Sequence, residues 1–217
     1  MADPFAVKDC ALIAISTGTH AQNLRELRDR LETVHPGCIY YHFWGGLLRP
    51  QFDEPEYMND FAAWSWRSLH DTRLAERLAL IDPTRFKDIE DLRRWLIEVI
   101  EQRLDEIDYI PWSKAAHQFH FARSQIVVFD THVRIQHAKK LQERISRMSL
   151  GSIFYHFIDA RRRTEQGNND FSQWLLSLGE EYADLAGMIA AIDPYFTTLA
   201  SLRNELDAVF KIYNLER

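Results

Sequence analysis

Two stretches of the chain nearly repeat each other: Cys38-Ile-Tyr-Tyr-His-Phe43 and, 114 positions later, Ser152-Ile-Phe-Tyr-His-Phe157. Further matches keep the same order along the chain. They pair Asn59-Asp-Phe-Ala-Ala-Trp64 with Asn169-Asp-Phe-Ser-Gln-Trp174, Ile81-Asp-Pro83 with Ile192-Asp-Pro194, and Leu92-Arg93 with Leu202-Arg203. Several short blocks that match in one order indicate duplication and fusion of one unit. We therefore predict two repeats, over residues 5–110 and 119–213, that pack about a pseudo-two-fold axis as a homodimer would.

Most of each repeat has the apolar spacing of helices. Leu24, Leu27 and Leu31 recur at helical spacing, and residues 88–107 form the longest amphipathic stretch. Asn59 is a favourable N-cap for the helix that follows it. We expect helices over residues 21–33, 40–49, 59–69, 74–81 and 88–107, and in the second repeat over residues 131–148, 152–163, 169–178, 182–192 and 197–213.

The opening of each repeat is ambiguous. Ala11-Leu-Ile-Ala-Ile15 and Gln125-Ile-Val-Val-Phe129 are short apolar runs, and Phe119-His-Phe121 alternates before the second run. Periodicity cannot distinguish a strand from a buried turn of helix in runs this short. We favour helix, and so predict a mainly α fold of two tandem helical repeats in one compact body. A short strand at the opening of each repeat is the alternative.

The composition indicates a folded protein with an acidic surplus. The chain is 46% apolar and carries a net charge of −6. Disordered chains have low hydrophobicity and few aromatic residues, so we expect a packed core. A nucleic-acid binder usually has a basic excess, and no apolar run approaches the ~18 residues that span a bilayer. We predict neither a nucleic-acid nor a membrane partner, and interpret the basic segment 134–163 as a solvated helix face.

Two features of the sequence indicate a cytoplasmic protein. The first residues do not form a basic region followed by a long apolar stretch, as a secretory signal would. Cys10 and Cys38 are the only cysteines, and without such a signal they are expected to be reduced thiols.

No motif of a catalytic or nucleotide-binding class occurs in the chain, whether P-loop, dinucleotide-binding glycine pattern, HExxH, nucleophile elbow or CxxC. Both repeats instead retain a polar set that we take as the candidate ligand-binding residues. These are His42, Arg49, Asp60 and Arg93 in the first repeat and His156, Arg163, Asp170 and Arg203 in the second. His and Arg seven positions apart lie on one helix face. Such a set could bind an anion through charge-assisted hydrogen bonds or transfer a proton.

Structural roles account for the same residues, and we favour them. Asn59-Asp60 before an apolar helix is typical of a cap followed by an acid that stabilises the helix dipole. His42 lies in an aromatic stretch, and Arg93 could pair with an acid. Trp64 and Trp174 are expected to pack in the core or between the two repeats rather than to serve as a stacking platform.

A metal site is a further possibility that we weigh. His42 and Asp60 could meet His156 and Asp170 across a two-fold axis. The ExxH pairs that characterise di-metal sites in helical bundles are missing from the sequence. We predict no metal and no cofactor.

The order of the motifs resembles an uncharacterised prokaryotic family of unknown function. Its pattern is an aromatic–His pair, then Asn-Asp-Phe-x-x-Trp, Leu-Ala and Leu-Arg. The first repeat carries it at residues 41–43, 59–64, 74–75 and 92–93, and the second at residues 155–157, 169–174, 185–186 and 202–203. The resemblance covers nearly the whole chain and implies a prokaryotic, cytoplasmic origin, but no activity.

These observations lead to two hypotheses about function. The first is a helical module of the bacterial cytoplasm that binds a partner protein or a small anionic ligand. The alternative is an enzyme that acts on a phosphorylated or acidic small molecule through the repeated His, Arg and Asp residues. Duplication without a catalytic motif favours the first hypothesis.

Overall fold

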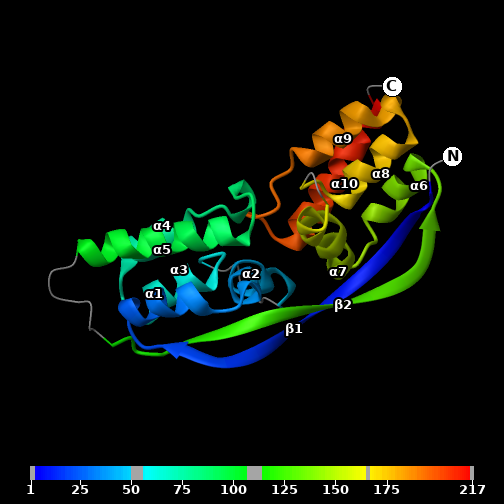
Figure 1. Cartoon of the computed structure of the whole chain (residues 1–217). Helices are drawn as coiled ribbons and strands as arrows, with labels where there is room; N and C mark the ends of the chain where they lie inside the picture. The colour runs from blue at the N-terminus through cyan, green and yellow to red at the C-terminus, as the bar shows by residue number, and fades with distance from the viewer. Residues whose placement is uncertain (1–2, 50–55, 107–113, 165–166, 216–217) are drawn as a thin grey trace. The chain divides into compact units, whose positions relative to one another are not determined.

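The computed structural model describes residues 3–49, 56–106, 114–164 and 167–215 (Figure 1). Within these ranges the chain forms ten α-helices and two β-strands. It divides into two compact units. Unit 1 comprises Met1–Ala11 and Ile126–Arg217, and unit 2 comprises Leu12–Gln125. Residue 110, the predicted end of the first repeat, lies outside the described residues.

Two long strands replace the helices expected at the openings. β1 (Phe5–Ala21) and β2 (Phe119–Ile135) form a two-stranded antiparallel sheet and run side by side in Figure 1. The prediction of a mainly α fold of tandem helical repeats in one compact body is therefore wrong. Both segments are rich in Val, Ile and Thr, whose branched side chains favour an extended backbone. The helix expected from residue 131 is wrong at its start for the same reason.

Each strand contributes to both units. The start of β1 lies in unit 1 and its remainder in unit 2, whereas the start of β2 lies in unit 2 and its remainder in unit 1. The Thr17 hydroxyl donates to the Phe121 carbonyl at 2.7 Å, and the Thr131 hydroxyl donates to the Val7 carbonyl at 2.5 Å. The same side-chain contact thus occurs once in each unit. Each unit combines the helices of one half of the chain with the first strand residues of the other half.

The helices of unit 2 begin at side-chain caps. They are α1 (Leu24–Thr33), α2 (Pro36–Trp44), α3 (Asp60–Arg67), α4 (Thr72–Ala79) and α5 (Ile89–Asp105), with 3-10 turns at Gly45–Leu48 and Pro83–Arg85. Asn59 accepts the Ala62 N–H, which confirms its predicted role as a cap. Asp88 accepts two backbone N–H groups in the same way at the start of α5. These local bonds explain why the sequence placed both helix starts correctly.

Unit 1 contains the remaining helices. They are α6 (Ala138–Ile145), α7 (Leu150–Ile153), α8 (Asp170–Leu178), α9 (Ala183–Ala190) and α10 (Leu199–Leu215), with a 3-10 turn at Glu180–Tyr182. The helix expected over residues 152–163 changes type instead, because a π-helical turn at Phe154–Ile158 and a 3-10 turn at Asp159–Arg162 follow α7. None of the helices in the described ranges is long and apolar enough to cross a membrane.

Both cysteine thiols lie in the core, and we expect them to be unreactive. Burial, with a contribution from the Asp159 carboxylate, raises the pKa of Cys10 to about 12, and burial also raises the pKa of Cys38. The thiolate is the reactive form of cysteine. An aromatic disulfide reagent at mildly alkaline pH should therefore label neither thiol in the native protein and both in guanidinium chloride. Rapid labelling of the native protein would contradict this expectation.

Candidate functional site

His42 is buried on α2, and both of its ring nitrogens are hydrogen-bonded. Its Nδ1 lies 2.8 Å from Asp60 Oδ2, and its Nε2 lies 3.1 Å from the backbone nitrogen of Ala122 in β2. Because Nε2 accepts this N–H, the ring is the neutral tautomer whose proton sits on Nδ1 and is donated to Asp60. His42 therefore connects α2 to the start of α3 and to β2.

Arg49 completes this arrangement. Its guanidinium donates to both carboxylate oxygens of Asp60, at 3.2 and 3.4 Å, and lies over the Tyr41 ring. Burial lowers the pKa of His42, and the opposing effect of Asp60 does not offset it. Burial alone would raise the pKa of Asp60, but the hydrogen bond from His42 and the charge of Arg49 outweigh it, so this pKa is also lowered. A neutral imidazole thus lies between a carboxylate and a backbone amide.

These shifts predict a loss of stability in mild acid. The pKa of His42 is lower in the folded chain than its ordinary value of 6.5, so the unfolded chain binds the proton first as the pH falls. The contribution of His42 is therefore present above pH 6.5 and decreases below it, while that of Asp60 is lost only at more acidic pH. Thermal unfolding at neutral and mildly acidic pH should show a lower Tm in acid. The decrease in Tm between neutral and acidic pH should be smaller for His42→Leu than for the wild type. An equal decrease in Tm in both chains would show that His42 does not cause the loss of stability in acid.

The same arrangement recurs in unit 1. His156 Nδ1 lies 2.8 Å from Asp170 Oδ2, and His156 Nε2 accepts the backbone N–H of Lys8 in β1 at 2.9 Å. Arg163 donates to Asp170 at 3.1 Å and also to Asp159. The structure thus brings together His156, Arg163 and Asp170, as it does His42, Arg49 and Asp60.

One tryptophan extends each of these sets. The Trp64 indole N–H donates to the His117 carbonyl at 2.7 Å, and the Trp174 indole N–H donates to the Asp3 carbonyl at 2.9 Å. The helices of each unit therefore hold a strand segment through one His and one Trp. We call each set a strand clamp; its members are His42, Arg49, Asp60 and Trp64 in unit 2 and His156, Arg163, Asp170 and Trp174 in unit 1. Sequence reasoning predicted that the tryptophans pack in the core or between the repeats, and both are buried. It did not predict that each indole N–H holds a distant backbone carbonyl.

Arg93 and Arg203 do not join the clamps. Arg93 is buried and donates to the carbonyls of Leu31 and Val34, where α1 ends. Arg203 donates to the Met148 carbonyl at 3.0 Å, in the turn after α6. The last carbonyls of a helix have no partner within the helix, and Arg93 satisfies such carbonyls at the end of α1. Arg203 satisfies a carbonyl of the turn that follows α6.

The clamp of unit 1 borders a cavity of about 430 Å³. Its lining includes His156, Arg163 and Asp170 together with Lys8 and Tyr155. Three of the eight predicted ligand-binding residues therefore share one cavity. The charge of Arg163 there is offset by the carboxylate to which it is bonded.

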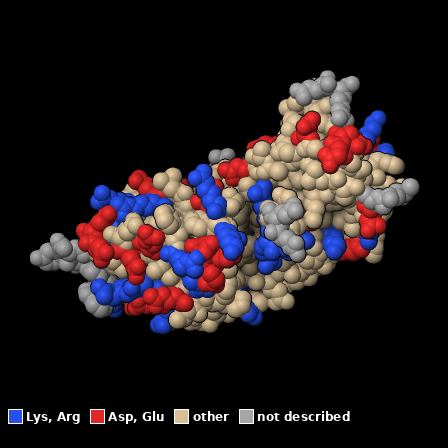
Figure 2. All heavy atoms as spheres, turned by 45° about the horizontal axis from the view of Figure 1, so that its top comes forward, with Lys and Arg blue, Asp and Glu red and all other residues tan. Residues whose placement is uncertain are grey.

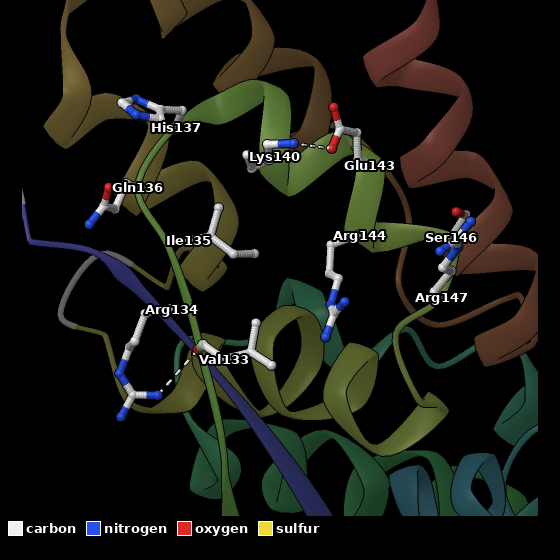
Figure 3. A pocket seen from close by; sticks show the side chains of 10 residues that line it. All are labelled: Val133, Arg134, Ile135, Gln136, His137, Lys140, Glu143, Arg144, Ser146 and Arg147. Carbon is white, nitrogen blue, oxygen red and sulfur yellow. Dashed lines mark hydrogen bonds and ion pairs between the residues drawn. The ribbon is translucent and has the colours of Figure 1, made fainter.

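A larger groove, of about 820 Å³, runs along α6 and the end of β2 (Figure 3). We call it the basic groove. Its charged and titratable lining residues are Arg134, His137, Lys140, Glu143, Arg144 and Arg147. Of these, Lys140 and Arg144 are four residues apart on α6, while His137 lies just before this helix and Arg147 lies in the turn after it. Sequence reasoning noted this basic segment but assigned it to a solvated face.

Part of the positive charge in the basic groove has no acidic partner among the residues that the structure describes. Arg134 pairs with Asp130 at 2.6 Å, and Lys140 pairs with Glu143 at 2.8 Å. Within the described ranges, no carboxylate lies within ion-pair distance of Arg144 or Arg147. Figure 3 shows the Arg144 side chain extending away from the Lys140–Glu143 pair. Uncompensated cations in a concave surface attract anions, and guanidinium groups bind phosphate and carboxylate in a bidentate manner.

The helices of unit 2 have a different charge distribution. Figure 2 shows Lys and Arg interspersed with Asp and Glu over this part of the surface. Arg103 pairs with Asp71 at 2.8 Å, and Arg77 pairs with Glu106 at 2.7 Å. Because opposite charges neutralise each other locally, the positive charges of Arg77 and Arg103 are offset by the carboxylates beside them. No group of three or more His, Cys, Asp or Glu side chains that could hold a metal ion occurs in the described part of the chain.

The geometry defines a class of α/β protein in which the helices of each half hold the opening strand of the other half. The chain belongs to a family of unknown function, DUF5752, whose model matches residues 2–211. This confirms the resemblance to an uncharacterised family. The fold is similar to the solved structure of OrfY from Thermoproteus tenax, with 26% identity, a TM-score of 0.83, and coverage of 98% of this chain and 97% of that chain. No curated protein matches the chain.

Proposed function

We propose that the protein is a non-catalytic binding module of the cytoplasm that holds a small anionic ligand in the basic groove. The observation that carries this proposal is the position of Arg144 and Arg147, two guanidinium groups without an acidic partner among the described residues, in a groove that His137 and Lys140 also line. This function agrees with the binding hypothesis drawn from the sequence and moves its site away from the repeated His, Arg and Asp residues.

The clamps support binding over catalysis. A general base needs a ring nitrogen that can take up a proton. The Nε2 lone pair of His42 is occupied by the N–H of Ala122, and that of His156 by the N–H of Lys8. Proton uptake would release the strand that each His holds. The enzyme alternative therefore requires the same atom to hold the fold and to perform the chemistry.

The size and charge spacing of the basic groove indicate the ligand class. Small-molecule sites have volumes of roughly 300–1,000 Å³, and this groove has about 820 Å³. Residues four apart on a helix have Cβ atoms about 5–6 Å apart, as Lys140 and Arg144 on α6 do. Arg147 lines the same groove from the turn after α6, so these cations can contact neighbouring anionic groups of one molecule. A diphosphate or dicarboxylate fits this arrangement better than a single anion does.

Titration calorimetry with inorganic pyrophosphate tests the proposal. We expect saturable binding that weakens as salt is added, because exposed charges are screened. Removing a hydrogen bond to a charged group costs about 1.5–3 kcal/mol, so Arg144→Gln and Arg147→Gln should each weaken binding about tenfold or more. Lys139→Gln is the matched control, since Lys139 is exposed on the same helix but does not line the groove. The proposal would be contradicted if pyrophosphate does not bind the wild-type chain, or if the arginine variants bind it as tightly as the wild type does.

A second candidate site is the cavity beside the clamp of unit 1. It is supported by the three predicted site residues that line it: His156, Arg163 and Asp170. Lys8→Gln distinguishes the two sites, because it removes a cation from this cavity and keeps the backbone N–H that His156 accepts. Weaker pyrophosphate binding by this variant, with unchanged binding by Arg144→Gln, would place the ligand at the clamp.

A further inference from the structure

The clamps hold two chain segments in the same register. We call these the docking segments: Asp3–Lys8 in unit 1 and His117–Ala122 in unit 2. In each, the carbonyl of the first residue accepts the indole N–H of a clamp Trp, at 2.9 and 2.7 Å respectively. The N–H of the sixth residue is donated to Nε2 of a clamp His, at 2.9 and 3.1 Å. The two contacts fix each segment at both ends through its backbone.

The third residue of each docking segment is a buried phenylalanine. In unit 1 the ring of Phe5 lies 5.4 Å from that of Phe171, 5.5 Å from that of Trp174 and 4.8 Å from that of His156. In unit 2 the ring of Phe119 lies in the same surroundings, 5.1 Å from Phe61, 5.6 Å from Trp64 and 4.7 Å from His42. The fifth residues, Val7 and Phe121, are also buried. Each segment therefore places two apolar side chains against the helices that hold its backbone.

Backbone hydrogen bonds combined with pockets for alternate side chains are the means by which proteins bind extended peptides. The segment that each set of helices holds is far away in the sequence. Lys8 is 148 positions from His156, and Ala122 is 80 positions from His42. Each set of helices thus has the contacts of a peptide receptor whose occupant arrives from the other half of the chain.

We propose that the helices of unit 1 form a receptor for an extended segment with an aromatic third and an apolar fifth residue, and that a second copy of this chain can supply that segment. Exchange of identical elements between chains preserves the contacts of the exchanged element and is a low-cost route to association. In a folded single chain the receptor is occupied by its own docking segment, whose effective concentration is high. Exchange therefore requires release of that segment. This inference does not depend on the basic groove.

Peptide binding to the full chain tests the receptor. The probe is a fluorescently labelled peptide of residues 3–12, and the acceptor is the Phe5→Ala chain, whose own segment lacks its anchor. We expect saturable anisotropy changes with Phe5→Ala and at least tenfold weaker binding to the wild type, whose receptor is occupied. A peptide that carries the same Phe5→Ala change should bind at least tenfold more weakly than the unaltered peptide. Absence of binding to the Phe5→Ala chain, or equal binding of the two peptides, would overturn the proposal.

A second measurement does not depend on the folding of the variant. Two wild-type chains with different affinity tags are unfolded and refolded together at high concentration, or refolded separately and then mixed. We expect the two tags to co-purify only after joint refolding, because only then is each receptor open to the segment of the other chain. If no mixed species forms after joint refolding, supply of the segment by a second copy is refuted.

Discussion

Phe119→Ala is expected to lower the free energy of unfolding by about 3–5 kcal/mol, the usual cost of truncating a buried phenylalanine. Phe119 is 4% exposed, and its ring contacts those of Phe61, Trp64 and His42. Truncation leaves a cavity where the strand meets the helices of unit 2. If the clamp is what joins them, this single change at the start of β2 should weaken the whole unit.

The matched control lies on the same strand. Phe129 is 51% exposed, so Phe129→Ala removes an equal number of atoms from a site that folding leaves largely in water. We expect a change within about 0.5 kcal/mol for this variant. Urea unfolding of the two variants and the wild type measures both effects. Equal effects of the two truncations would show that the start of β2 is not held in the way described.

His42→Leu is the second change with a large expected effect. Leucine fills the space of the imidazole approximately but leaves the Ala122 N–H without its acceptor and Asp60 without its donor. A buried hydrogen-bonding group left unsatisfied costs about 1–3 kcal/mol, and the exposed edge of Asp60 moderates its share. We therefore expect a loss of stability in this range from urea unfolding.

His137→Leu is the control for this variant, since His137 is exposed and its side chain makes no cap hydrogen bond at the start of α6. It should leave the free energy of unfolding nearly unchanged. If His42→Leu is as stable as the wild type, the histidine is not needed to hold β2. The presence of a histidine at this position in both repeats would then require another explanation.

The sequence predicted those parts of the fold that depend on local bonds. Asn59 and Asp88 cap their helices through backbone groups two or three residues away, so the residue type at one position indicates where the helix begins. The strands could not be assigned in this way. Their apolar runs are partly exposed in a two-stranded sheet, as at Ile13 and Val128, and so lack the strict alternation of a half-buried strand.

The sequence predicted which side chains belong to the clamps, but not which backbone groups these side chains hold. Repetition identified His42, Arg49 and Asp60 as a set, and the structure brings them together. The atoms that His42 and Trp64 hold are backbone groups of Ala122 and His117, and a backbone group leaves no signature of residue type. Their role in holding a distant strand therefore became visible only with the fold.

The basic groove illustrates a related limit. The cations of α6 are evident in the sequence, but their net effect depends on which carboxylates approach them. Glu143 neutralises Lys140. Arg144 directly follows Glu143 in the sequence, but its side chain points away from this pair (Figure 3). Spacing alone could not distinguish a neutralised helix face from a site with free positive charge.

Pyrophosphate calorimetry on two variants, at a temperature where both are folded, tests the central claim most directly. One variant carries Arg144→Gln and Arg147→Gln in the basic groove, and the other carries His156→Leu in the clamp of unit 1. We predict that the groove variant loses binding with little change in its free energy of unfolding, whereas the clamp variant is less stable and binds with an unchanged Kd. The opposite result, in which the groove variant binds as the wild type does and His156→Leu loses binding, would contradict the account and place the ligand at the clamp.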